Sequence, residues 1–135
     1  MRYSLSQIHG IGPVHQAELS RLNVRNTDKL IHVVSDPVER RHIARSTGLP
    51  EKELKRWRNF AQLLRIPGIG PTWATLLSEA KVDSLVRLAD SEPRALTTEL
   101  QRRAERHGWK RVPSSDQVTR WVGDAKTLHR GTAAD

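Results

Sequence analysis

The sequence predicts an all-α protein in which two copies of one helical unit pack into a single compact bundle. The first observation is an internal repeat, because the hexapeptide that starts at Ile8 returns in closely similar form at Ile66. The second is that apolar residues recur at spacings of three and four along several segments, which is the period of a helix. The third is that no segment alternates apolar and polar residues in a sustained way, so we expect essentially no sheet.

The repeat covers most of the chain and sets its organisation. Ile8-His9-Gly10-Ile11-Gly12-Pro13 recurs 58 residues later as Ile66-Pro67-Gly68-Ile69-Gly70-Pro71. Nearer the C-terminus the offset is 64, as Trp57 matches Trp121, which predicts an insertion in the second copy around 108–113. We assign residues 1–65 to the first repeat, 66–130 to the second and 131–135 to a flexible tail. Each half is too small to bury a stable core alone, so we expect both repeats to fold as one unit.

Within each copy, short breaks separate the expected helices. Proline at the first position favours helix initiation, and a preceding Asp, Ser or Glu is typical of a cap. The predicted helices are 13–23, 27–34, one that begins at Asp36-Pro37, and 50–64 in the first copy, and 71–81, 84–89, one that begins at Glu92-Pro93, and one capped by Ser114-Ser115-Asp116 in the second. Trp57 and Trp121 lie on apolar helical faces and are expected in the core, whereas Trp73 and Trp109 are expected to be partly exposed.

The two Gly-Ile-Gly turns are the most informative motif. The first glycine of each turn can adopt a positive φ angle and so permits a tight reversal. The isoleucine between the glycines can point inward and hold the flanking helices together. The second glycine leaves the first amides of the next helix uncovered, and such amides bind phosphate readily. The candidate phosphate-binding residues are therefore Gly10, Ile11, Gly12, Gly68, Ile69 and Gly70, although the same turns also serve as purely structural corners in other proteins.

The pattern apolar-x-Gly-apolar-Gly is the helix-hairpin-helix signature, and the chain resembles a bacterial family catalogued as a domain of unknown function (family 4332). The resemblance extends over nearly all of residues 3–128, and its matching segments are Ile8–Pro13, Leu22–Leu30, Trp57–Gly70, Leu76–Leu88 and Pro113–Lys126. It implies a fold of tandem helix-hairpin-helix units. The wider helix-hairpin-helix DNA-binding superfamily implies sequence-independent binding of DNA through the amides of the turns.

The positive charge lies mainly outside the turns. The superfamily usually has Lys or Arg two or three residues after the second glycine, where this chain has Val14-His15 and Thr72-Trp73. The net charge is nonetheless +8, and residues 40–65 hold eight Lys or Arg against two Glu. Basic residues concentrated in this way are typical of polyanion binding, although a solvated surface has the same composition. The candidate contacts on the helices are Lys52, Lys55, Arg56, Arg58 and Arg120, with Arg56 and Arg120 each directly before a core tryptophan.

Several classes of function find no support in the sequence. The absence of cysteine excludes disulfides, thiolate zinc sites and a cysteine nucleophile. There is no phosphate-binding Lys loop, no serine elbow and no His-Glu metal helix, and the six histidines lack metal-ligand spacing. We therefore expect no catalytic residues, no metal and no cofactor. No apolar stretch is long enough for a membrane span and no secretory signal is visible, so we expect a cytoplasmic protein, associated with the nucleoid if it binds DNA.

The expected function is non-enzymatic, sequence-independent DNA binding, in which the turn amides and the basic helices contact the phosphates of a duplex. Two alternatives stay open. One is a protein-protein interaction adaptor that uses the same bundle to dock an acidic partner, and the other is binding of structured RNA. The composition does not distinguish DNA from RNA.

Overall fold

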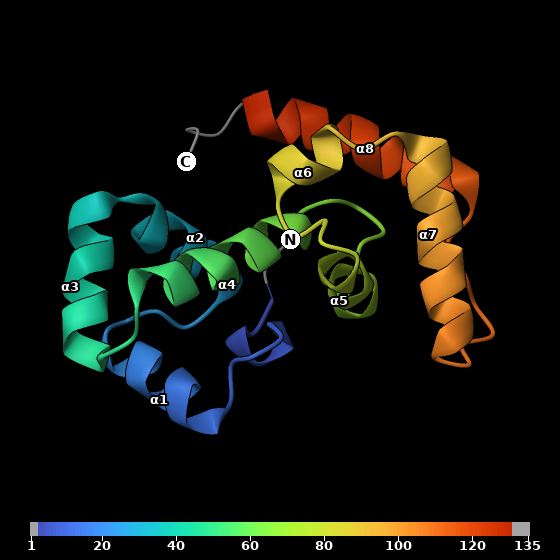
Figure 1. Cartoon of the computed structure of the whole chain (residues 1–135). Helices are drawn as coiled ribbons and strands as arrows, with labels where there is room; N and C mark the ends of the chain where they lie inside the picture. The colour runs from blue at the N-terminus through green and yellow to red at the C-terminus, as the bar shows by residue number, and fades with distance from the viewer. Residues whose placement is uncertain (1–2, 131–135) are drawn as a thin grey trace. The chain divides into compact units, whose positions relative to one another are not determined.

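Eight α-helices and one short 3-10 helix make up the secondary structure of residues 3–130, which are the residues described by the computed structural model (Figure 1). The expected tail, 131–135, lies outside the described residues. Within them there is no strand, and the sole extended pairing is an isolated bridge between Ser4 and Asn26. The prediction of an all-α fold is confirmed. The chain divides into two units, Met1–Arg65 and Ile66–Asp135.

The first unit contains η1 (Leu5–Gln7), α1 (Pro13–Arg21), α2 (Thr27–Ser35), α3 (Pro37–Thr47) and α4 (Glu51–Leu63). Helix α2 packs against α3 and α4, and α1 contacts α3 and η1. The core between them is mainly aliphatic around the rings of Trp57 and Phe60, and Leu5, Leu19, Leu30, Leu54 and Trp57 are fully buried. Burial of this apolar surface is the main force that holds short helices together, since isolated helices of this length are marginal in water.

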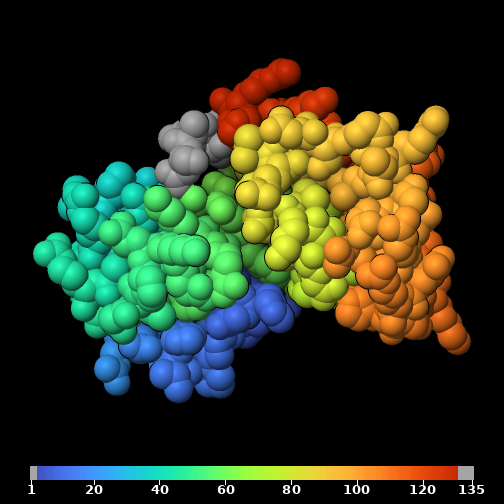
Figure 2. Space-filling model, viewed as in Figure 1, coloured from blue at the N-terminus to red at the C-terminus, as the bar shows by residue number. Residues whose placement is uncertain are grey.

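The second unit contains α5 (Pro71–Glu79), α6 (Leu85–Ala89), α7 (Pro93–Arg106) and α8 (Ser115–Arg130). Helices α6 and α7 pack against α8, and α5 contacts α7. Its buried residues include Leu77, Leu88, Ala104, Val118 and Trp121. Within this unit, exposed side chains of α7 can be followed in the space-filling view (Figure 2). The expected core positions of Trp57 and Trp121 are confirmed.

Helices α1 and α5 end in the same way and earlier than expected. Asn23 and Lys81 adopt positive φ angles of 65° and 66°. In each case the next residue folds back, as the Val24 amide donates to the Leu19 carbonyl and the Val82 amide to the Leu77 carbonyl, both at 2.9 Å. This left-handed termination satisfies carbonyls that would otherwise lack partners at the helix end. The predicted ends at residues 23 and 81 are therefore wrong by two residues, and the helices end at Arg21 and Glu79.

Side-chain caps begin most of the other helices. Asn26 and Ser84 accept from the amides of Lys29 and Arg87 at the starts of α2 and α6. At the starts of α3 and α7, Asp36 and Glu92 accept from the amides of Val38 and Ala95, as the sequence predicted. At α8, Ser114 accepts from the Gln117 amide at 3.2 Å and donates its own amide to the Gln117 side chain at 3.0 Å, which is a capping box.

The extra length of the second unit is divided between a helix and a loop. Helix α7 has 14 residues where α3 has 11. The connection that follows runs over 107–114 in the second unit and only over 48–50 in the first. The insertion expected at 108–113 therefore accounts for part of the difference, and the additional turn of α7 accounts for the rest. The longer loop carries Trp109, Lys110 and Arg111.

One residue of the basic segment 40–65 is structural. Arg40 is buried, and its Nη1 donates to the carbonyl of Val34 at 2.8 Å while its Nε donates to Glu51 Oε1 at 2.9 Å. These bonds connect the last turn of α2 to α3 and α4. A buried carbonyl without a partner is costly, so this guanidinium stabilises the unit. It does not belong to a solvent-facing basic surface.

Candidate nucleic-acid interface

The two Gly-Ile-Gly turns, which we call the first turn (residues 8–13) and the second turn (66–71), have nearly identical backbones. Gly10 and Gly68 have φ angles of 99° and 89°, in the region that favours glycine. Each turn is closed by one hydrogen bond, from the Ile11 amide to the Ile8 carbonyl at 3.1 Å and from the Ile69 amide to the Ile66 carbonyl at 3.0 Å. The turn was expected to lie between two helices. The element before the first turn is the short 3-10 helix η1 and not an α-helix.

In each turn, both the side chain and the backbone amide of the isoleucine have a structural role. Ile11 and Ile69 are buried, which confirms that their side chains point inward. Their amides already donate within the turns, so they are not free for phosphate. This hydrogen bonding argues against the expectation that Ile11 and Ile69 bind phosphate through their backbone. The reason is that the hydrogen bond that closes a tight turn already uses this amide as its donor.

The uncovered amides lie at the starts of the following helices. Gly12 and Gly70 are the N-caps of α1 and α5, and neither helix has a side-chain cap. Both glycines have ordinary extended angles, and a Cβ atom at either position would meet nothing within 4 Å. The first turns of α1 and α5 therefore present open backbone, with the positive end of the helix dipole directed outward.

A core tryptophan lies directly beneath the first glycine of each turn. A Cβ atom placed on Gly10 would be 3.3 Å from Nε1 of Trp57, and one placed on Gly68 would be 3.2 Å from Nε1 of Trp121. Both separations are tighter than most real Cβ contacts, so a side chain at either position would force the indole to shift by a few tenths of an ångström, in addition to the strain of the positive φ angle. The contact attaches each turn to the last helix of its own unit. Nε1 of Trp57 is buried and has no hydrogen-bond partner among the described residues.

The first turn also has a cation beside it. Nη2 of Arg56 would lie 3.6 Å from a Cβ atom on Gly10, so the guanidinium of α4 reaches the surface of the turn. The side chain is 60% exposed and forms an ion pair with Glu53, one helical turn away. Arg120, which follows the same pattern in α8, is exposed but does not come within 4 Å of a Cβ atom on Gly68. The two turns therefore differ in their local charge.

The family described as "Domain of unknown function (DUF4332)" has a model that matches residues 9–128. The chain belongs to this family. No curated protein and no solved structure matches the chain significantly.

The other basic candidates of this DUF4332 chain are not equivalent. Lys52 is exposed and Lys55 is half-buried on α4. Arg58 is buried, with 5% of its surface exposed, and its Nε and Nη2 donate to the side chain of Asn59 at 3.1 and 3.0 Å. The expectation that Arg58 lies on the solvent-facing side is wrong, because α4 is covered by both α2 and α3 and buries a wider arc than one apolar stripe.

Aromatic rings line the start of the helix after each turn. His15 in α1 lies on Trp57, with ring centroids 5.3 Å apart, and Trp73 at the matching position of α5 lies on Trp121 at 6.4 Å. Nδ1 of His15 is buried without a hydrogen-bond partner among the described residues. Trp73 and Trp109 are both half-buried, as expected from their lack of a core pattern. Their rings are also in edge contact, which was not predicted. Position 15 corresponds to position 73 in the repeat. This correspondence is the feature of the sequence from which the shared ring contact could have been predicted.

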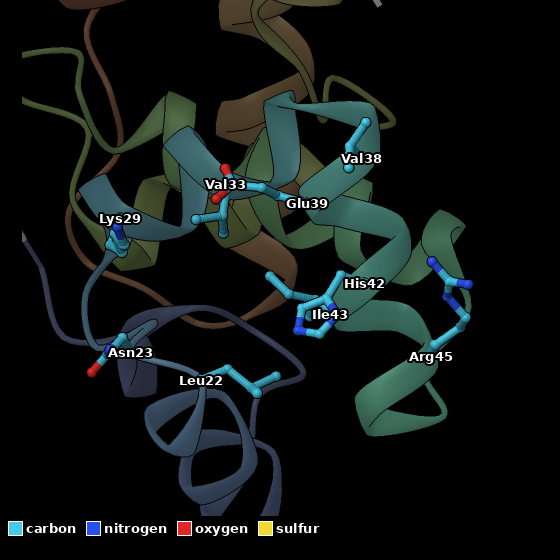
Figure 3. A pocket seen from close by; sticks show the side chains of 9 residues that line it. All are labelled: Leu22, Asn23, Lys29, Val33, Val38, Glu39, His42, Ile43 and Arg45. Atoms are coloured by element: carbon cyan, nitrogen blue, oxygen red, sulfur yellow. The ribbon is translucent and has the colours of Figure 1, made fainter.

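The DUF4332 chain has a pocket in its first unit, away from the turns (Figure 3). Its volume is about 560 Å³, and the C-terminal end of α1 forms it together with α2 and α3. Its lining residues combine apolar and charged side chains and comprise Leu22, Asn23, Lys29, Val33, Val38, Glu39, His42, Ile43 and Arg45. In the close view His42 points from α3 toward Leu22, the residue that follows α1. Val38, at the rim, is 65% exposed.

Among residues 3–130, no three His, Cys, Asp or Glu side chains are grouped so that they could hold a metal ion. Nor is any helix there both long enough and apolar enough to cross a membrane.

Proposed function

We propose that this chain is a non-enzymatic protein that binds duplex DNA without sequence preference, as a tandem helix-hairpin-helix protein. The observation that carries the proposal is the combination at the first turn of an uncapped helix N-terminus and the Arg56 guanidinium. The amides of α1 can donate to a phosphate, and Arg56 supplies the charge that Val14 and His15 do not. A cation from α4 therefore takes the place of the basic residue that usually follows the second glycine.

The two turns differ in what they offer to a phosphate. The second turn has the same open amides without the neighbouring cation, so we expect the first turn to contribute more binding energy.

The net charge of +8 supports long-range attraction to a polyanion. Its contribution is measured by the salt dependence of binding, because each neutralised phosphate releases counterions. We expect similar affinities for unrelated duplexes and a log-linear fall of affinity with salt, with a slope of about −0.9 for each phosphate contacted. Failure to bind any duplex at low salt contradicts the proposal.

The decisive comparison uses two matched arginines. Arg56 and Arg102 are both exposed, at 60% and 56%, and each pairs with a glutamate three residues earlier in its helix. Arg56→Gln and Arg102→Gln therefore each remove one exposed charge that pairs with a glutamate, although Glu99 keeps Arg103 as a second partner. Arg56 lies beside Gly10, and Arg102 does not come within 4 Å of a Cβ atom there. We expect Arg56→Gln to weaken duplex binding and to flatten the salt slope by about one unit, and Arg102→Gln to have a smaller effect. Equal effects of the two variants contradict a specific role of the first turn.

The amides are tested separately from the cations. Gly12→Val adds a side chain at a position with an ordinary φ angle and open space, so the fold tolerates it while the approach to the amides is obstructed. We expect weaker duplex binding with an unchanged salt slope, because no charge is lost. Unchanged affinity for this folded variant contradicts phosphate binding at the start of α1.

The pocket favours a second candidate function, a protein-protein adaptor. Its apolar lining, the exposed Val38 and the two cations Lys29 and Arg45, which outnumber the single carboxylate of Glu39, suit an acidic partner with an apolar anchor. Val38→Glu tests this candidate, since it should abolish capture of such a partner while leaving duplex binding nearly unchanged. The remaining alternative is binding of structured RNA. Binding assays with duplex RNA test it, and a higher affinity for duplex RNA than for duplex DNA would favour it.

A further inference from the structure

The second unit has a column of four aromatic rings that extends from its core to its surface. Trp121 is buried, Trp73 and Trp109 are half-buried, and His107 is exposed. Trp73 contacts Trp121 at 6.4 Å and Trp109 edge-on at 6.0 Å. His107 stacks on Trp109 with centroids 4.6 Å apart and ring planes 17° apart. Its Nε2 is held by Glu79 Oε1 at 2.8 Å, so the outermost ring has a fixed orientation.

The first unit has only the inner half of this column. His15 and Trp57 correspond to Trp73 and Trp121, with similar tilts of 49° and 44° between the rings. The outer rings, His107 and Trp109, come from the long loop that replaces the short connection at 48–50. The first unit packs its core without these two rings. Core packing therefore does not explain why the second unit has them.

The surroundings of the column are suited to an anion that carries an aromatic ring. Trp73 is the third residue of α5, so its ring lies in the first turn of a helix without a side-chain cap. Lys110 and Arg111 directly follow Trp109, and both are exposed. Amide donors, cations and a stack of rings therefore occur within one short stretch of surface. A nucleotide presents the complementary groups, a phosphate next to a flat π-system.

We propose that this column binds an unpaired nucleobase of single-stranded DNA, which stacks on His107 while its phosphates contact Lys110, Arg111 and the start of α5. The inference rests on the proposed function and names its substrate class: the preferred ligand is a duplex that continues into a single strand. Base stacking is sequence-tolerant because every base has a π-face, which agrees with binding without sequence preference. The second turn thereby acquires a role different from that of the first.

The test compares two fluorescein-labelled probes with the full chain, a blunt duplex and the same duplex with a single-stranded oligo(dT) overhang. We expect the wild-type chain to bind the overhang probe more tightly and its tryptophan emission to be quenched when that probe binds. His107→Ala with Trp109→Leu should lower the ratio of overhang to blunt affinity by about fivefold or more, since the loss of one stacked base costs at least that factor. Blunt-duplex affinity should stay within about twofold.

Two controls separate stacking from charge and from misfolding. Lys110→Gln with Arg111→Gln should weaken binding of the overhang probe and flatten its salt slope, with a smaller effect on the blunt duplex. Trp109→Phe retains a ring and should preserve the ratio, whereas His107→Ala alone should lower it without touching the core. Circular dichroism and thermal melting verify the fold of each variant, and a double variant that fails to fold is replaced by His107→Ala.

The outcomes distinguish this inference from the proposed function. If the wild-type chain binds both probes equally, or if the ratio is unchanged in a folded His107→Ala variant, base stacking is wrong while duplex binding stands. If the chain binds neither probe at low salt, both proposals fail. Tight binding of the overhang probe with a ratio that depends on His107 supports the inference.

Discussion

The contact between glycine and tryptophan at each turn predicts a specific pattern of stability. Gly68→Ala introduces a Cβ atom 3.2 Å from Nε1 of Trp121 at a residue with a φ angle of 89°. Gly108→Ala is the matched control in the same unit, since Gly108 has a φ angle of 74° and a Cβ atom there meets nothing within 4 Å. Both variants bear the left-handed strain of about 1–2 kcal/mol, and both gain equally from a stiffer unfolded chain. Their difference therefore isolates the steric contact.

The size of that difference follows from the burial of the ring. Trp121 is 2% exposed, so it cannot move away without disturbing its neighbours. Overpacking of a well-packed core costs about 1–3 kcal/mol. We expect Gly68→Ala to lower the free energy of unfolding by about that much more than Gly108→Ala, which corresponds to roughly 3–12 °C in melting temperature for a chain of this length.

The assay is urea denaturation followed by tryptophan fluorescence, with thermal melting by circular dichroism as a second measurement. The first unit offers the same experiment, with Gly10→Ala against Gly48→Ala, because Gly48 also combines a positive φ angle with open space. If Gly68→Ala is no less stable than Gly108→Ala, and the first-unit pair behaves likewise, the indole does not constrain the turn and the reasoning is refuted.

Three further predictions concern packing and cooperativity. Arg40→Gln should lower the free energy of unfolding by about 1–3 kcal/mol in urea denaturation, because the buried hydrogen bond to the Val34 carbonyl is lost. A salt slope of DNA binding unchanged from wild type would show that Arg40 takes no part in DNA binding. Asn26→Ala and Ser84→Ala should each cost about 1 kcal/mol by thermal melting, and no loss at either would contradict the assigned caps. Residues 1–65 and 66–135 expressed separately should lack sharp melts, and two independent cooperative transitions would overturn the expectation of one folding unit.

Features that depend on local chemistry or on periodicity could be predicted from the sequence. The apolar face of α4 placed Trp57 in the core, and the corresponding face of α8 placed Trp121 there. The caps at Asp36 and Glu92 followed from a polar residue before proline. Such signals are contained within a few consecutive residues, or repeat at a fixed spacing, so tertiary packing is not needed to read them.

The chemistry of the candidate site depended on contacts that the sequence does not encode locally. Arg58 lies next to Trp57 in α4, and a single apolar stripe would leave it in solvent. It is buried because two helices cover α4 from different sides. The direction of the Arg56 side chain toward Gly10 likewise depends on the packing of α4 against the first turn. The use of the Ile11 amide within that turn required the observed hydrogen bond.

The closure of each turn by its own backbone has a consequence for the thermodynamics of recognition. The bonds from Ile11 to Ile8 and from Ile69 to Ile66 form without a ligand, and the inward isoleucines fix the backbone further. A loop that must become ordered when it binds loses conformational entropy, and this loss is subtracted from its affinity. These turns are already ordered, so an anion that contacts the following amides meets a preorganised site. Its binding would release counterions and water with little compensating loss of chain entropy.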